Sequence, residues 1–287
     1  PDGKIAVDNS TFTSLRKKHK FFDLPLIRGI VSFIEQLKLS MDMLSKSAEM
    51  QGIDTEQPET KFEKWLCDKF GDKLMSVVTG VGTVLGLAIG VVMFLMLPTF
   101  AAKGLDFLSG GFIGTSHFLR ALVEGLIRIG VFVGYIALTS LMPDMRRTYE
   151  YHGAEHKSVA CFEKGLPLTP ENAAACTRFH PRCGTSFMFV MLIISIIVNS
   201  FLTWDNVWLR FGLKILTIPV IVGLGFEFIR YAGSHNNLFV KILSAPGLWM
   251  QRITTREPDL TQLEVALEAL KNAIPEEFSE HHDIETE

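Results

Sequence analysis

Residues 151–157 read Tyr151-His152-Gly153-Ala154-Glu155-His156-Lys157, and residues 180–184 read His180-Pro181-Arg182-Cys183-Gly184. Both runs belong to one polar segment, residues 143–184, and long apolar segments flank it on either side. His, Cys and Glu are side chains that commonly bind zinc and other transition metals in proteins. This concentration of metal-ligand side chains between apolar segments is therefore the feature from which fold and function are predicted.

Four apolar segments have the length of membrane-spanning helices: residues 75–97, 118–142, 185–204 and 211–231. An α-helix rises 1.5 Å per residue, so about 20 residues cross the roughly 30 Å hydrocarbon core of a bilayer. The chain is 48% hydrophobic, with 22 Phe and 11 Met. That apolar content is concentrated in these segments, unlike in an ordinary soluble domain. The sequence predicts an all-α, polytopic membrane protein with about four transmembrane helices.

Five regions follow from this pattern. Residues 1–74 form an N-terminal region at the cytoplasmic surface of the membrane, with an amphipathic helix over 24–50 and a short charged helix over 61–73. Residues 75–142 and 185–231 each hold two spans, and residues 143–184 are the cytoplasmic metal-site segment. Residues 232–287 hold an interfacial segment, an amphipathic C-terminal helix that begins after residue 258, and an acidic tail. The apolar seam of that helix could pair with another helix or pack on the body of the protein.

Basic residues indicate the orientation in the membrane. Residues 1–74 and 143–184 are rich in Lys and Arg, whereas the two other connections hold little more than Lys103 and Arg210. The positive-inside rule then places both termini and the metal-site segment in the cytoplasm. The formal charge of −3 says little about partners, and a nucleic-acid partner is not expected. The four Cys show no disulfide spacing.

His152 and His156 are four residues apart, so on a helix both imidazoles leave the same face and can bind one ion. The order His-x-x-Glu-His is that of the inverted zincins, in which Glu155 would be the general base. Zinc, or another divalent transition metal, is the expected cofactor. The alternative is an exposed helical face that binds no metal.

A catalytic zinc usually has three protein ligands and one open position. His180 and Cys183 are the nearest further candidates, and Glu227 near the end of the last span is another. If His180 and Cys183 both bind, the site is a closed structural site, and the protein need not be an enzyme.

Charged residues near the site and inside one span are additional candidates. Four arginines could clamp a phosphate or carboxylate of a substrate, or could serve only as topogenic charges: Arg146, Arg147, Arg178 and Arg182. Glu124 and Arg128 lie four residues apart in the second expected span, where charges are costly unless paired, and we expect them to pair.

Several of these runs resemble the YqhQ family of bacterial membrane proteins. They are Met145-Arg146-Arg147-Thr148-Tyr149-Glu150 continuing to Lys157, Leu168-Thr169-Pro170-Glu171-Asn172, and His180-Pro181-Arg182-Cys183-Gly184-Thr185-Ser186-Phe187. Similarity at residues 25–29, 251–258 and 262–266 extends the resemblance over nearly the whole chain. It implies a location in the bacterial cytoplasmic membrane and a metal-dependent enzyme with no assigned reaction. The metal role that it implies is carried onto His152, Glu155, His156, His180 and Cys183.

Two main functions of different class remain open, and a transporter, suggested by the charges of Arg120, Glu124 and Arg128 within a span, is a weaker third. One is a cytoplasm-facing zinc hydrolase of unknown substrate in the membrane. The other is a non-enzymatic membrane anchor or assembly factor, in which a structural metal site docks a cytosolic protein or complex. The lipid bilayer is an expected partner in both cases, and glycine-rich spans leave room for a homo-oligomer.

Overall fold

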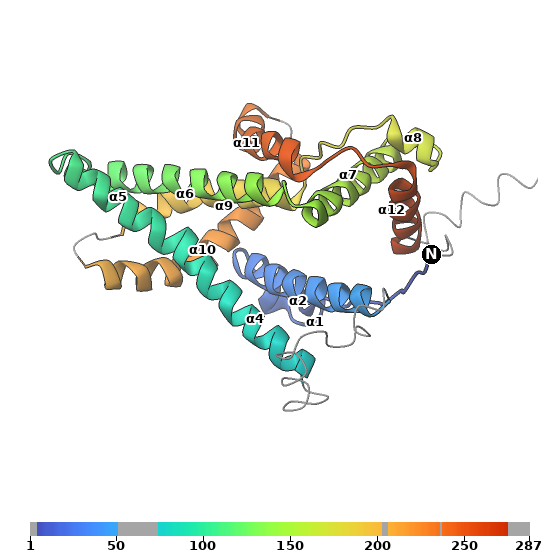
Figure 1. Cartoon of the computed structure of the whole chain (residues 1–287), viewed down its shortest axis with the longest axis horizontal. Helices are drawn as coiled ribbons and strands as arrows, with labels where there is room; N and C mark the ends of the chain where they lie inside the picture. Colours follow the sequence, from blue (N-terminus) through green and yellow to red (C-terminus); the bar gives the residue numbers. More distant parts are fainter. Residues whose placement is uncertain (1–4, 51–73, 203–205, 236, 275–287) are drawn as a thin grey trace, which may run out of the picture. The chain divides into compact units, whose positions relative to one another are not determined.

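The computed structural model describes residues 5–50, 74–202, 206–235 and 237–274 (Figure 1). The helix expected over 61–73 and the acidic tail after residue 275 lie outside these residues. All regular structure in the described part of the chain is helical, as the sequence predicts.

The chain divides into two compact units, and each is described by itself. Unit 1 comprises Pro1–Thr13, Phe132–Ile194 and Leu224–Glu287, and unit 2 comprises Ser14–Val131 and Ser195–Gly223. Three helices contribute residues to both units: α6 (His117–Thr139), α9 (Gly184–Asn199) and α10 (Val207–Ser234).

Three helical stretches are long and apolar enough to cross a membrane: Gly80–Leu108, His117–Thr139 and Trp208–Ser234. The chain is thus a membrane protein with three candidate spans among the residues described. The fourth expected span, 185–204, forms the 16-residue helix α9, which at 1.5 Å per residue is about 24 Å long. It ends at Asn199 because the chain tightens there, with the Ser200 amide donating to the carbonyls of both Ile196 and Ile197.

The first stretch is longer than expected, because the helix does not end at residue 97. It runs through α4 (Leu74–Val91), the π-helical η4 (Val92–Met96) and α5 (Leu97–Leu108). Pro98 is tolerated because it stands in the first turn of α5, directly after the π-helical turn. The stretch ends where Gly110 and Gly111 adopt φ values of 66° and 86°, which glycine permits at little cost.

The N-terminal part of unit 2 consists of α1 (Leu15–Lys18), η1 (Lys20–Asp23) and α2 (Ile27–Met50). The helix expected over 24–50 is therefore present as α2. Its exposed side chains include the large apolar residues Ile34, Leu37 and Leu44, as expected for a helix that lies on a membrane surface. The carboxylate of Glu35 accepts hydrogen bonds from the Ser14 hydroxyl and the Leu15 amide and so joins α2 to α1.

Unit 1 is built around α7 (Pro143–Glu163), which contacts α8 (Pro170–Ala174), α11 (Leu238–Thr254) and α12 (Leu260–Ala273). The last helix begins at a capping box made by Asp259 and Gln262. Its residues Leu263 and Leu267 are 1% and 3% exposed and join a core with residues of α7 and α8. The seam of the C-terminal helix therefore packs on the body of unit 1, and each Leu contributes roughly 1.5–3 kcal/mol by burial.

Candidate metal centre

Helix α7 carries two histidines on one face. Pro143 stands in its first turn, where no backbone donor is needed, and Asp144 follows near the positive end of the helix dipole. His156 is 5% exposed and His152 is half-buried. The rings lie 4.5 Å apart between centroids, so the spacing of four residues brings them together as the sequence predicts.

The loop before α9 brings a cysteine to these histidines. Cys183 directly precedes Gly184, the first residue of α9, and is 8% exposed. Gln251 of α11, which is fully buried, holds this loop in place. Its side chain accepts from the His180 amide at 2.8 Å and donates to the His180 carbonyl at 2.7 Å and to the Ser186 hydroxyl at 3.0 Å.

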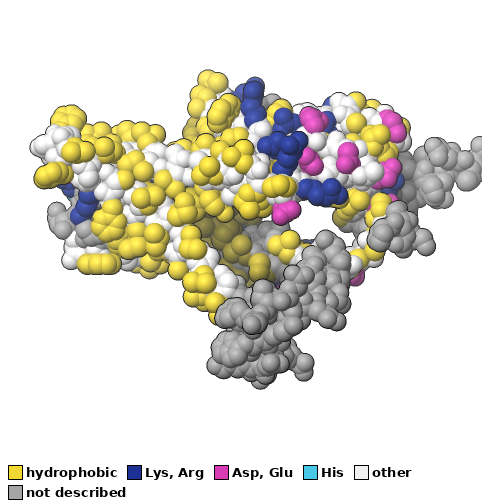
Figure 2. All heavy atoms as spheres, in the orientation of Figure 1, with side chains coloured by type: hydrophobic (Ala, Val, Ile, Leu, Met, Phe, Trp, Pro, Cys, Tyr) yellow, Lys and Arg dark blue, Asp and Glu magenta, His cyan; other side chains and the backbone are white. Residues whose placement is uncertain are grey.

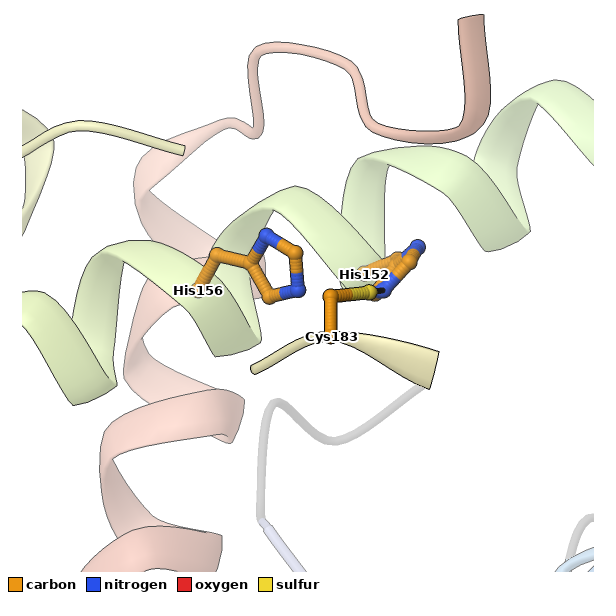
Figure 3. Close-up of side chains that lie close together, drawn as sticks. All are labelled: His152, His156 and Cys183. Carbon is orange, nitrogen blue, oxygen red and sulfur yellow. Dashed lines mark hydrogen bonds between the residues drawn. The ribbon is translucent and has the colours of Figure 1, made fainter. Parts of the chain in front are cut away.

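His152, His156 and Cys183 form the candidate metal-binding group. One ligand atom from each residue can be chosen so that all three lie within 4.8 Å of one another. Nε2 of His152 lies 3.2 Å from Sγ of Cys183, and the two side chains point toward one another across the space between α7 and the loop (Figure 3).

Both imidazoles are oriented by backbone carbonyls. Nδ1 of His152 lies 2.8 Å from the carbonyl oxygen of Thr254, and Nδ1 of His156 lies 2.6 Å from that of Arg178. A carbonyl oxygen only accepts, so each Nδ1 carries the proton and each Nε2 keeps its lone pair for the site. Metal-binding histidines are held in this way in many proteins, so the donor set fits a transition metal such as zinc.

Gly153 allows the segment after α11 to reach the site. The Arg256 amide donates to the Tyr149 carbonyl at 2.8 Å, so residues 254–256 lie directly on α7. A Cβ atom at Gly153 would stand 1.9 Å from the Arg256 carbonyl oxygen. Glycine in the His-Gly-Ala-Glu-His run therefore permits the close approach that puts the Thr254 carbonyl beside His152.

The electrostatics of the group favour a thiolate at Cys183 when no metal is bound. Burial alone would raise the pKa of Cys183, but hydrogen bonds with His152, His156 and Thr185 lower that pKa to about 5. Burial alone would lower the pKa of His152, but its contacts with Cys183 and Thr254 and the nearby charge of Glu155 raise it above the usual value. A cation is therefore favourable beside the sulfur.

His180 lies next to the group and points elsewhere. Its ring centroid is 5.8 Å from that of His156. Its Nδ1 accepts from the Arg182 amide at 3.3 Å, and its Nε2 lies 3.4 Å from a Glu163 carboxylate oxygen. That Nε2 is buried and has no hydrogen-bond partner among the described residues. The metal role expected for His180 stays a prediction.

Glu155 is exposed on α7, one residue before His156. Its charge reaches His152, as the raised pKa of that imidazole indicates, but in the described structure it is not one of the three grouped ligands. The role of general base expected for Glu155 stays a prediction.

The remaining candidates occupy different places. Arg182 pairs with Glu163, and the Arg147 guanidinium lies 5.6 Å over the Tyr151 ring. Arg146 pairs with Glu150 at 3.3 Å on α7. Glu227 is a half-buried residue of α10, and the three-ligand group does not include it.

Glu124 and Arg128 pair at 3.0 Å in unit 2, as predicted. Glu124 is 2% exposed and also binds Lys214 and, at 3.2 Å, Arg210. Thr99 completes the cluster by donating to Glu124 at 2.9 Å. Sequence reasoning missed the two α10 cations, although basic residues within an apolar segment are a signal of buried partners.

The residues that orient the site were also missed. Gln251, Thr254 and Arg178 lie far from the histidines in sequence, and two of them act through backbone carbonyls, which no side-chain pattern reveals. The only available signal was Gly153, because a glycine inside a helical pattern often marks a close packing contact.

Comparison with known proteins places the chain in a family. It is 32% identical over 252 residues to the protein named "Uncharacterized protein YqhQ" of Bacillus subtilis (strain 168), covering 88% of this chain and 77% of that protein. No solved structure matches the chain. The family model described as "Protein of unknown function (DUF1385)" matches residues 24–276. The chain therefore belongs to the DUF1385 family, and YqhQ is one of its relatives.

Proposed function

We propose that this protein is a metal-dependent hydrolase of the bacterial cytoplasmic membrane, with zinc held by His152, His156 and Cys183. The candidate spans and the three grouped ligands support this proposal. Both termini and the metal-site segment face the cytoplasm in it, as the distribution of Lys and Arg favours.

One observation carries the proposal. The Nδ1 atoms of two histidines on one helical face donate to backbone carbonyls, which leaves both Nε2 lone pairs beside a buried thiol of low pKa. A core histidine that serves only packing needs no such arrangement on both rings. Two imidazoles and one thiolate make three protein ligands, which is the number found in catalytic zinc sites that keep one position open.

Zinc bound by three protein ligands supplies Lewis-acid chemistry and activates water at neutral pH. The side chains of this protein have separate tasks. The Thr254 and Arg178 carbonyls fix the imidazoles, and Gln251 fixes the loop that carries Cys183. Glu155 is exposed and electrostatically close to His152, so it can accept a proton from water and return it to a leaving group.

The metal content of the purified full chain tests the proposal. Elemental analysis of wild type should find about one zinc per chain, as a three-ligand catalytic site requires. His152→Ala and Cys183→Ala should lose most of it. His235→Ala is the matched control, because His235 is exposed directly after the end of α10 and should not alter the metal content. A wild type that stays metal-free after incubation with zinc would contradict the proposal.

The variant Glu155→Gln shows whether Glu155 is a general base or a metal ligand. The variant should keep its zinc, because Glu155 is not among the grouped ligands. It should lose about 10²–10⁴-fold in hydrolysis rate, the usual contribution of a general base. The measurement uses a panel of chromogenic phosphate, carboxyl-ester and peptide substrates. Asp144→Asn is the control for loss of charge on the same helix, because Asp144 is exposed in the first turn of α7. Loss of zinc in Glu155→Gln would make Glu155 a ligand instead.

One observation favours a second function, that of a membrane anchor or assembly factor with a structural metal. The buried Nε2 of His180 meets no hydrogen-bond partner among the described residues, and its ring adjoins that of His156. A turn of this ring would close a His₃Cys site. X-ray absorption of the zinc-loaded protein distinguishes the two functions. One sulfur, two imidazoles and an oxygen support the hydrolase, whereas one sulfur and three imidazoles support the anchor.

A further inference from the structure

A cavity of about 370 Å³ lies in unit 1 where the first half of α7 faces the end of α11. Its lining consists of Arg146, Glu150, Arg178, Arg252, Thr255, Arg256 and Glu257. Figure 2 shows Lys and Arg side chains gathered at the places of α11 and α7 in Figure 1, with Asp and Glu beside them. The volume lies in the range of small-ligand sites.

The charges of the lining leave an excess of two positive charges. Arg146 pairs with Glu150 at 3.3 Å, and Arg178 pairs with Glu257 at 3.1 Å. Arg252 and Arg256 are the two guanidinium groups that remain. Within the part of the chain that the structure describes, neither lies within ion-pair distance of a carboxylate. A dianion would balance the two.

Arg256 is held in place and still offers a donor. Its amide donates to the Tyr149 carbonyl at 2.8 Å, and its Nη2 donates to the Ser140 carbonyl at 3.3 Å. Its Nε is buried and has no hydrogen-bond partner among the described residues. Burying an Arg Nε–H away from water is unfavourable unless a hydrogen-bond acceptor replaces the water. The unmet donor therefore points to an acceptor absent from the chain itself.

Arg178 is preorganised in the same way. Its guanidinium donates to the Thr255 carbonyl and, at 3.0 Å, to the Thr255 hydroxyl. These bonds fix a planar group at the wall of the cavity before any ligand arrives. One guanidinium group can donate to two oxygens of the same phosphate. A guanidinium that is already fixed in place loses less entropy when the phosphate binds.

We propose that this cavity binds a phosphate group, carried by a soluble metabolite or by a lipid headgroup. The site is separate from the metal centre and does not depend on the proposed hydrolase. At about 100° per residue, Arg146 and Glu150 leave α7 on a different side from His152. Residues 254–256 connect the two sites, because the Thr254 carbonyl binds His152 while Thr255 and Arg256 line the cavity.

Binding of defined probes to the full chain in phosphate-free maltoside detergent tests the proposal. Calorimetry measures the binding of inorganic phosphate and of glycerol 3-phosphate, and native mass spectrometry measures how much phosphatidylglycerol stays bound to the protein. The double variant Arg252→Gln/Arg256→Gln should bind at least about tenfold more weakly than wild type, since charge-assisted bonds to phosphate are lost. Arg252→Lys/Arg256→Lys keeps the charge and should recover part of the binding.

Arg147→Gln is the matched control, because Arg147 adjoins Arg146 on α7 but does not line the cavity. If the Gln double variant loses binding of the soluble phosphates and the Lys double variant recovers part of it, the ligand is a soluble metabolite. If the loss of binding is confined to phosphatidylglycerol, the ligand is a lipid headgroup. Equal binding by the Gln double variant and wild type, or no binding by wild type, overturns the proposal. So does phosphate binding that disappears in His152→Ala, because the phosphate would then bind at the metal centre.

Discussion

At the scale of single residues, Gly153 has a more specific role than its place between two histidines suggests. The space over its Cα is filled by the carbonyl of Arg256. That contact sets the path of residues 254–256 and so the position of the carbonyl that orients His152. The glycine therefore acts on the candidate metal centre without contacting a metal.

Gly153→Ala should weaken metal binding. The new Cβ would lie 1.9 Å from a backbone oxygen, so the segment must move and the bond from His152 to Thr254 must lengthen. Loss of such an outer contact typically costs about 10–100-fold in metal affinity. Competition with a zinc-binding dye measures the change. Gly134→Ala, on a helical surface with open space, should leave the affinity unaltered, and equal affinity in Gly153→Ala would contradict this account.

The sequence predicts the ligands better than their supports. His152, His156 and Cys183 could be found because their chemistry lies in their side chains, and all three belong to one polar segment. The supports could not, because Thr254 and Arg178 contribute peptide carbonyls that every residue has. The direction of His180 depends on Gln251, which comes 71 residues later. The sequence contains no pattern that links the two.

At the scale of elements, the helices of unit 2 are joined by a buried carboxylate. Pro98 has no N–H, so the Phe94 carbonyl lacks the donor that residue 98 supplies in a regular helix. Arg128 of α6 donates to this carbonyl at 2.9 Å and to Glu124 at 3.0 Å. Lys214 of α10 also binds Glu124. The π-helical turn η4 and the charged residues of α6 and α10 thus belong to one hydrogen-bonded cluster.

Glu124→Gln should destabilise unit 2 strongly. The change leaves Arg128, Arg210 and Lys214 buried without their common carboxylate, and breaking a buried ion pair typically costs about 3–5 kcal/mol. Thermal unfolding in detergent measures the loss. Lys214→Met added to Glu124→Gln should restore part of it, because one uncompensated cation is removed. A double variant no more stable than Glu124→Gln would refute the assignment of Lys214 as a partner.

Helix type and position followed from hydropathy more reliably than helix ends. The pairing of Glu124 with Arg128 was predictable because both lie on one helix, four residues apart. The partners Arg210 and Lys214 lie on α10, some 86 and 90 residues from Glu124, and only the folded chain brings them to it. The first span was predicted to end at Leu97 because the 23 residues from Met75 already match the thickness of the bilayer core, yet the helix continues to Leu108.

At the scale of the whole molecule, the two units contain different polar sites. The grouped metal ligands and the arginine-lined cavity both belong to unit 1, whereas the buried cluster around Glu124 belongs to unit 2. Unit 1 is assembled from distant parts of the chain, since α7, the loop before α9 and the segment after α11 all meet at the candidate centre. A ligand that binds there must therefore stabilise segments that are remote in sequence.

Zinc should change hydrogen exchange in unit 1 and leave unit 2 nearly unaltered. A ligand that binds only the folded state raises the free energy of unfolding by about 4 kcal/mol when its concentration is 1,000 times its dissociation constant. The free energy of any local opening that releases the ligand rises by the same amount, so such openings become rarer. Mass spectrometry should therefore find slower exchange at residues 149–160, 178–186 and 250–256 after zinc is added to stripped protein. The same experiment on His152→Ala should give no difference. Protection spread equally over residues 80–131 would mean that zinc acts on the chain as a whole, and the assignment of the metal centre to unit 1 would be wrong.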